Sequence, residues 1–142
     1  MATTRTASTH WEGTLMEGAG KVSMDSSGLG AFDLTWASRA NEPEGRTSPE
    51  ELIAMAHSGC FSMALSNMLA KAGSPARALD TRADVTFQPG EGITGIVLTV
   101  RADVPGMSAE DFATHAEAAK QGCPVSKALT GTTITLDAAL AG

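Results

Sequence analysis

The residues best suited to chemistry in this 142-residue sequence are its two cysteines, Cys60 and Cys123. A thiolate is a strong nucleophile, and two thiols that meet can interconvert between dithiol and disulfide. Cys60 lies in a long uncharged stretch, where a free cysteine is often only a small apolar core residue. Cys123 precedes Pro124 and should stand at a helix N-terminus, where backbone N–H groups favour the thiolate; a loop thiol without a role is the alternative.

His57 lies three residues before Cys60, so on a helix both side chains share one face. The pair is compatible with the Cys–His dyad of an acyl-transfer enzyme or with half of a metal site. No third orienting group or further ligand follows at a suitable spacing, so we prefer a core or interface histidine. The motifs GxSxG, GxxxxGK[ST] and GxGxxG are absent, which leaves hydrolase and nucleotide-binding interpretations unsupported.

Cys60 sits at the middle of a helix predicted over 48–71. The ends carry a capping serine, a proline at the first helical position, a glutamate of a capping box and a terminal glycine: Ser48, Pro49, Glu51 and Gly73. No charged residue occurs between Leu52 and Ala70, a length that would suffice to cross a bilayer. Its serine and asparagine side chains and His57 argue against a lipid-facing span. We therefore expect a helix buried on nearly all sides within protein.

Strands are predicted on both sides of this helix, with a second helix following them. Before it, 10–17, 21–25 and 31–36 suggest an antiparallel meander, and 38–47 a charged loop that carries Arg39 and Arg46. After it we expect a hairpin over 79–88 and 93–103, a helix from Ser108 to Gly122, a helical turn to Leu129 and a strand over 132–140. This order defines an α+β fold around a long central helix.

Length and charge limit the possible partners. The chain should form a single domain over 1–142, in which complete covering of the central helix requires a partner chain. Ten basic and 16 acidic residues give a net charge of −6, which disfavours nucleic acid and anionic membranes. The first residues lack the apolar core of a signal peptide, so we expect a cytoplasmic protein with reduced thiols.

The segment NEPEGRTSPEELIAMAHSGCFSMALS, together with the later GCPVSKAL, resembles the OsmC/Ohr family of osmotically inducible and organic hydroperoxide resistance proteins, on the OsmC side. The likeness covers nearly the whole chain, including HWEG at 10–13 and the terminal TLDAAL. It implies a thiol-dependent peroxidase that acts on organic hydroperoxides and is reduced by an external dithiol. It also implies an intertwined homodimer whose central helices are wrapped by antiparallel sheets, with no metal, flavin or haem.

By motif match, Cys60 corresponds to the peroxide-attacking cysteine of this family and Cys123 to the resolving cysteine. Glu50 and Arg39 match its activating pair. Ala40 follows Arg39 where the family usually has an aromatic residue, so Arg46 is a possible substitute. A nearby Arg would favour the thiolate, and a Glu would fix the plane of its guanidinium.

Glu50 and Cys60 are ten residues apart on one helix, about 15 Å at about 1.5 Å per residue. We therefore expect Glu50 to reach Cys60 from the antiparallel helix of a second chain. The implied reaction converts Cys60 to a sulfenic acid, which condenses with Cys123 to a disulfide. Two alternatives remain: a non-catalytic member of the fold that binds an apolar ligand at the dimer interface, and an acyl-transfer enzyme that uses Cys60 and His57.

Overall fold

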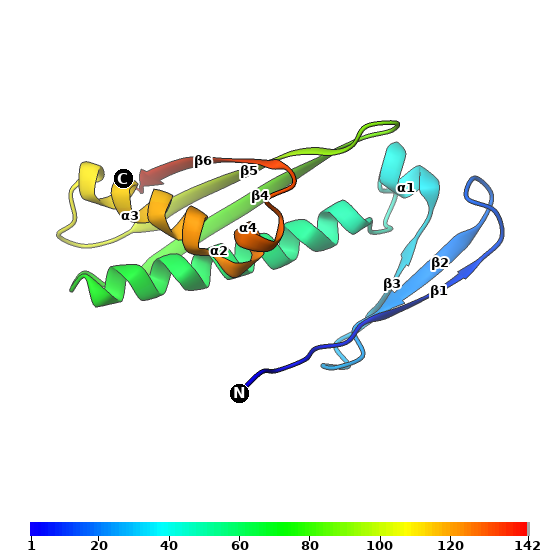
Figure 1. Ribbon diagram of the computed structural model, residues 1–142, viewed down its shortest axis with the longest axis horizontal. Coiled ribbons are helices and arrows are strands. Elements are labelled where there is room, and N and C mark those ends of the chain that lie inside the picture. Colours follow the sequence, from blue (N-terminus) through cyan, green and yellow to red (C-terminus); the bar gives the residue numbers. More distant parts are fainter. Residues whose placement is uncertain (142) are drawn as a thin grey trace. The chain divides into compact units, whose positions relative to one another are not determined.

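The computed structural model describes residues 1–141, which form two compact units. The first is Met1–Leu52, and the second begins at Ile53. The long helix α2 (Pro49–Lys71) begins in the first unit and continues through the second (Figure 1). The predicted central helix over 48–71 is therefore confirmed.

The first unit contains a three-stranded antiparallel sheet in the order β1-β2-β3. Its strands are β1 (Ser8–Glu12), β2 (Ala19–Ser23) and β3 (Ala31–Leu34). The predicted meander is confirmed, but its first strand ends at Glu12 instead of residue 17. Gly13 adopts a φ of 91°, a left-handed conformation that a strand cannot continue through.

A short helix, α1 (Trp36–Ala40), replaces the first part of the loop expected over 38–47. The Thr35 side chain accepts a hydrogen bond from the Ser38 backbone N–H at 3.1 Å, and the Ser38 hydroxyl accepts one from the Thr35 N–H at 2.9 Å. This reciprocal capping satisfies N–H groups that a helix start leaves unpaired. The sequence did not predict this helix because Ser38 stands at the third helical position, where a capping box usually has glutamate. Arg39 is consequently held on a helix.

The ends of α2 follow the expected chemistry, with one difference. The Ser48 hydroxyl accepts a hydrogen bond from the Glu51 N–H at 3.1 Å, as an N-cap should. The Glu51 carboxylate accepts from the Thr47 hydroxyl at 2.7 Å, so only half of the predicted capping box forms. At the other end Gly73 adopts a φ of 84°, which terminates the helix.

The second unit contains a mixed three-stranded sheet in the order β4-β5-β6. The predicted hairpin is confirmed as β4 (Ala78–Gln88) and β5 (Gly92–Asp103). The expectation of purely antiparallel sheets is wrong here, because β6 (Thr133–Leu140) runs parallel to β5. Two helices, α3 (Ala109–Gly122) and α4 (Pro124–Ala128), lie between these strands in the chain and supply the crossover that parallel pairing requires (Figure 1).

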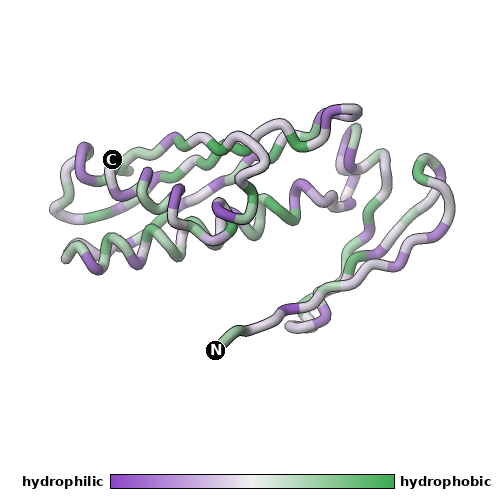
Figure 2. Tube along the Cα trace, viewed as in Figure 1, coloured by the Kyte–Doolittle hydropathy of each residue, from purple (hydrophilic) through white to green (hydrophobic). Residues whose placement is uncertain are grey.

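The core of the second unit lies where α2, α3 and the sheet meet. Its buried apolar side chains come from each of these elements and include Phe61, Leu65 and Leu69 of α2, Leu98 and Val100 of β5, and Phe112, Ala116 and Ala119 of α3. Apolar residues recur along the whole of α2 (Figure 2). The spacing of three and four residues on the helices places each set on one face.

The second unit covers only one face of its part of α2, although the sequence predicts burial on nearly all sides. Met55 and Met63 are 58% and 75% exposed, and Gly59 and Ala70 lie on the same open side. Among the described residues, α2 is also the one helix long and apolar enough to cross a membrane, a test that core helices of other proteins pass as well. The second unit by itself therefore leaves an apolar stripe on this helix uncovered.

Candidate active site

Cys60 and Cys123 lie side by side within the second unit. Cys60 comes from the middle of α2, and Cys123 from the junction between α3 and α4. Both cysteines are free thiols; Cys123 is fully buried, and Cys60 is partly buried against the same core. Cys60 packs against the core cluster that contains Cys123, and the Cys123 thiol is close enough to act on the pKa of Cys60. The structure thus brings together the two thiols that the sequence singled out.

The position of Cys123 follows from the way two helices meet. Its N–H donates to the Ala119 carbonyl at 2.9 Å, which closes α3, and its own carbonyl accepts from the Lys127 N–H at 3.0 Å, which opens α4. Pro124 occupies the first turn of α4, where a missing N–H costs nothing. The predicted helix N-terminus is confirmed, and the residue is enclosed by protein.

The surroundings of Cys60 disfavour its thiolate. Burial, followed by the Cys123 side chain, raises the pKa of Cys60, while the Val125 backbone N–H acts in the opposite direction. That N–H belongs to the first turn of α4, which has no side-chain cap. None of these groups carries a positive charge. A further cation is therefore needed to make Cys60 a strong nucleophile near neutral pH.

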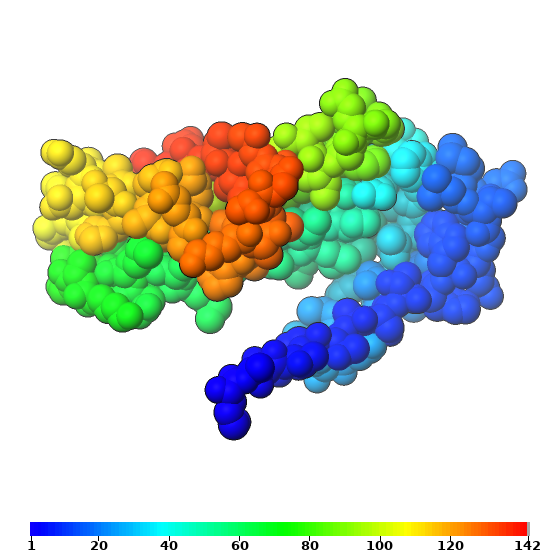
Figure 3. Space-filling view, in the orientation of Figure 1, coloured from blue at the N-terminus to red at the C-terminus, as the bar shows by residue number. Residues whose placement is uncertain are grey.

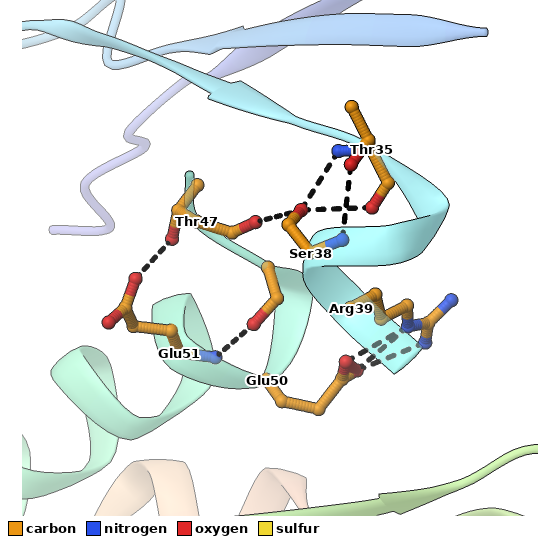
Figure 4. Close-up of polar contacts among 7 residues, drawn as sticks. Thr35, Ser38, Arg39, Thr47, Glu50 and Glu51 are labelled. Carbon is orange, nitrogen blue, oxygen red and sulfur yellow. Dashed lines mark hydrogen bonds and ion pairs between the residues drawn. The ribbon is translucent and has the colours of Figure 1, made fainter. Parts of the chain in front are cut away.

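Arg39 and Glu50 form a two-pronged ion pair within the first unit (Figure 4). The Arg39 Nε lies 2.9 Å and 3.2 Å from the two carboxylate oxygens of Glu50, and its Nη2 lies 3.0 Å from one of them. The Glu50 side chain is only 8% exposed, and that of Arg39 is 32% exposed. Because Glu51 takes the capping contacts, the Glu50 carboxylate is free to fix the guanidinium plane.

Arg46, the alternative partner, lies elsewhere in the first unit. Lys21 chiefly, and Arg46 to a smaller extent, hold the pKa of Asp33 below its usual value. Arg46 is exposed, and the carboxylate of Glu50 is taken by Arg39. The geometry therefore selects Arg39 as the arginine that Glu50 orients.

His57 is a core histidine, as the sequence indicated. It is fully buried, and its Nε2 lies 2.7 Å from the hydroxyl of Ser126 in α4. The other ring nitrogen, Nδ1, is buried without a partner, and burial lowers the pKa of His57. Because the ring bonds to Ser126 and not to Cys60, the geometry lends no support to a Cys–His dyad.

Sequence reasoning missed the contributions of Val125 and Ser126. The signal for Ser126 was available: it follows Cys123 by three residues, just as His57 precedes Cys60 by three. As for metals, within residues 1–141 no three His, Cys, Asp or Glu side chains group as ligands.

Two neighbouring free cysteines, one on a long helix and one at a helix start, are an arrangement that suits thiol–disulfide chemistry. The sequence matches the family described as OsmC-like protein over residues 42–137. It is also 44% identical over 131 residues to Peroxiredoxin OsmC of Escherichia coli (strain K12), with 90% of each chain covered. The chain therefore belongs to the OsmC-like family.

Solved structures agree with this assignment at the level of the fold. An organic hydroperoxide resistance protein OsmC from Legionella pneumophila superposes with a TM-score of 0.73 at 21% identity, covering 98% of each chain. The organic hydroperoxide resistance protein OhrB of Bacillus subtilis gives 0.67 at 23% identity, covering 96% of this chain and 98% of that one. The α+β OsmC-like fold is confirmed, and with the 44% identical peroxiredoxin the chain is a cysteine-based peroxidase.

Proposed function

We propose that the chain reduces organic hydroperoxides to alcohols, and hydrogen peroxide more weakly, through a Cys60 sulfenic acid and a Cys60–Cys123 disulfide. The observation that carries this proposal is the direct contact between the two thiol side chains. A resolving thiol must reach the attacked one without a large rearrangement, since disulfide geometry tolerates little variation. Cys123 already meets that condition in the reduced protein.

The chemistry balances with the two thiols, the peroxide and a reductant. The Cys60 thiolate attacks one peroxide oxygen, the O–O bond breaks, and the leaving alkoxide takes a proton to become the alcohol. The resulting sulfenic acid reacts with the Cys123 thiol, which forms the S–S bond and releases water. An external dithiol then reduces the disulfide by exchange and is itself oxidised.

A homodimer completes the site in this proposal. Cys60 has no cation among the groups that set its pKa, and Glu50 lies about 15 Å along the same helix at about 1.5 Å per residue. The open face of α2 with Met55 and Met63 suits an antiparallel copy of the same helix. The Arg39–Glu50 pair of one subunit then stabilises the Cys60 thiolate of the other.

The surroundings of Cys60 support a preference for alkyl hydroperoxides. Other partly buried apolar residues that pack against the same core cluster as Cys60 include Ala64, Met68 and Val125. Burial of a substrate's alkyl group against such apolar side chains stabilises the complex by about 25 cal/mol per Å² of apolar surface. Hydrogen peroxide has no alkyl group to bury and gains little. We therefore assign organic hydroperoxides as the preferred substrates.

The remaining assignments follow from the dimer and the charge. The chain acts as one OsmC-like domain over 1–142, in the cytoplasm, with a dithiol reductant as its partner. An α2 face covered by a second subunit is not available to lipid, and a net charge of −6 disfavours nucleic acid and anionic membranes.

The test compares consumption of cumene hydroperoxide and of hydrogen peroxide with a dithiol reductant in wild type, Cys60→Ser and Cys123→Ser. Wild type should consume the organic peroxide faster, and Cys60→Ser neither peroxide. Cys123→Ser should discharge one equivalent and then stall or overoxidise. Absence of thiol loss in wild type would instead support an apolar-ligand-binding protein, and unimpaired turnover of Cys123→Ser would remove Cys123 from the mechanism.

A further inference from the structure

Two side-chain contacts join α2 to α4, and they are one helical turn apart on both helices. His57 contacts Ser126, and Cys60 contacts Cys123. The two segments run antiparallel here, since Cys60, the later residue on α2, meets Cys123, the N-cap residue that precedes α4. In the space-filling view the α4 segment lies directly on α2 (Figure 3). A buried polar contact therefore stands beside the redox contact.

The polar contact is enclosed by protein on both sides. His57 is fully buried and Ser126 is 4% exposed. Their 2.7 Å hydrogen bond is the only bond that the His57 ring makes within residues 1–141, since Nδ1 has no partner. Separation of the pair would leave a second ring nitrogen and a hydroxyl buried without partners. That penalty strongly favours one fixed position of α4 on α2.

The first turn of α4 is held by its junction with α3 and by the packing of Cys123 and Val125 on the core, and the Ser126 contact adds the polar bond to α2. Helix α4 has five residues, and no side chain caps its N-terminus. That first turn nevertheless carries both groups that act on Cys60, namely the Cys123 thiol and the Val125 N–H. Movement of the turn would displace both groups together.

We propose that His57 and Ser126 are positioning residues for the redox pair, whose hydrogen bond holds the first turn of α4 against α2 so that Cys123 and the Val125 N–H stay on Cys60. The inference rests on the proposed disulfide mechanism and adds to it two residues that touch neither peroxide nor reductant. Among the described residues the His57 ring bonds to Ser126 and not to Cys60, so the geometry gives His57 no role as a base for that thiol.

Loss of the pair should affect two separate steps. The Cys123 thiol, which raises the pKa of Cys60, and the Val125 N–H, which lowers it to a smaller extent, are displaced together, so the pKa of Cys60 falls. The reaction of the Cys60 sulfenic acid with Cys123 also becomes slower, because a disulfide requires Cβ atoms about 3.5–4.5 Å apart. A slower closure leaves more time for a second peroxide to convert the sulfenic acid to sulfinic acid.

The experiment uses Ser126→Ala and the double variant His57→Leu/Ser126→Ala, in which both polar partners are removed together and none is left unpaired. Ser62→Ala is the matched control. The Ser62 hydroxyl bonds the Ser58 carbonyl at 2.8 Å and the Thr81 hydroxyl at 2.7 Å, and so ties α2 to β4 and not to α4. Thermal unfolding verifies that each variant is folded.

Three quantities are measured: the pH dependence of Cys60 alkylation by iodoacetamide, the rate of Cys60–Cys123 closure with diamide, and the sulfinic acid formed per turnover with cumene hydroperoxide. We expect closure slowed about tenfold in both α4 variants, less than the roughly 100-fold loss that a full 1 Å misplacement can cause. Alkylation should shift to lower pH, because the larger effect of Cys123 on the pKa of Cys60 is lost, and sulfinic acid should increase, with Ser62→Ala like wild type. Folded α4 variants with wild-type closure and an unchanged alkylation profile would overturn the inference.

The first two measurements use no peroxide, so they separate this inference from the proposed function. If wild type closes the disulfide with diamide but not with cumene hydroperoxide, the proposed peroxidase mechanism fails while the positioning role is still measured. If the single variant Ser126→Ala does not fold, the closure rate and alkylation profile of the double variant test the inference, because removing both polar partners leaves neither one unpaired.

Discussion

The guanidinium of Arg39 and the carboxylate of Glu50 face each other across three N–O contacts of 2.9–3.2 Å, at the point where α1 meets the first turn of α2. The carboxylate is almost fully buried, so the planar arginine is held in one orientation before any substrate arrives. No cation is among the groups that act on the pKa of Cys60, and an oriented guanidinium could supply one.

Replacing the arginine should impair the chemical step. Arg39→Lys keeps the charge but loses the planar fork that matches the Glu50 carboxylate. We expect kcat/KM for cumene hydroperoxide to fall about 10- to 100-fold, a loss of about 1.4–2.8 kcal/mol of transition-state stabilisation. Steady-state kinetics with a dithiol reductant measures it. Arg46→Lys is the control and should retain wild-type kinetics; the opposite ranking would assign the activating role to Arg46.

Mixing two inactive variants tests whether the site is shared between subunits. Cys60→Ser retains the Arg39–Glu50 pair, and Glu50→Gln retains the thiol. Random mixed dimers with a shared site should recover about a quarter of wild-type activity, since half of the dimers are mixed and each holds one complete site of two. Activity is measured after joint refolding or co-expression. No recovery in verified mixed dimers would place both groups in the same subunit.

The open face of α2 should be required for association. Met63 is 75% exposed in the single chain and lies on the proposed helix–helix contact. Met63→Glu places an unpaired charge in that contact, at a cost of several kcal/mol. We expect a monomer by light scattering, with peroxidase activity lost. Ala113→Glu, on the exposed side of α3, is the control and should remain dimeric. A fully active Met63→Glu monomer would contradict the two-subunit site.

The sequence predicts most of the fold, because the periodicity and caps of α2, α3 and the hairpin agree with their packing. It could not place α1, whose capping depends on Ser38 in a position where glutamate is usual. It also could not show the parallel direction of β6, which is set by the crossover through α3. Cys60 and Cys123 could be singled out by type and place in the chain, whereas the choice between Arg39 and Arg46 needed the actual position of the Glu50 carboxylate.

The buried His57 should make stability depend on pH in a definite direction. Burial lowers the pKa of His57 in the folded protein below its ordinary value of 6.5. Below about pH 6.5 the unfolded chain binds a proton at His57 that the folded chain binds less readily, so the free energy of unfolding decreases as the pH falls. The contribution is at most about 1.4 kcal/mol per pH unit. It is absent at higher pH, where the imidazole is neutral in both states.

Urea denaturation at intervals between pH 7.5 and pH 5 measures this slope. His57→Gln carries no titrating group, so its stability should decrease less steeply over that interval than that of wild type. Equal slopes for wild type and His57→Gln would show that His57 does not resist protonation in the folded protein. The hydrogen bond to Ser126 would then have to be formed by a charged ring.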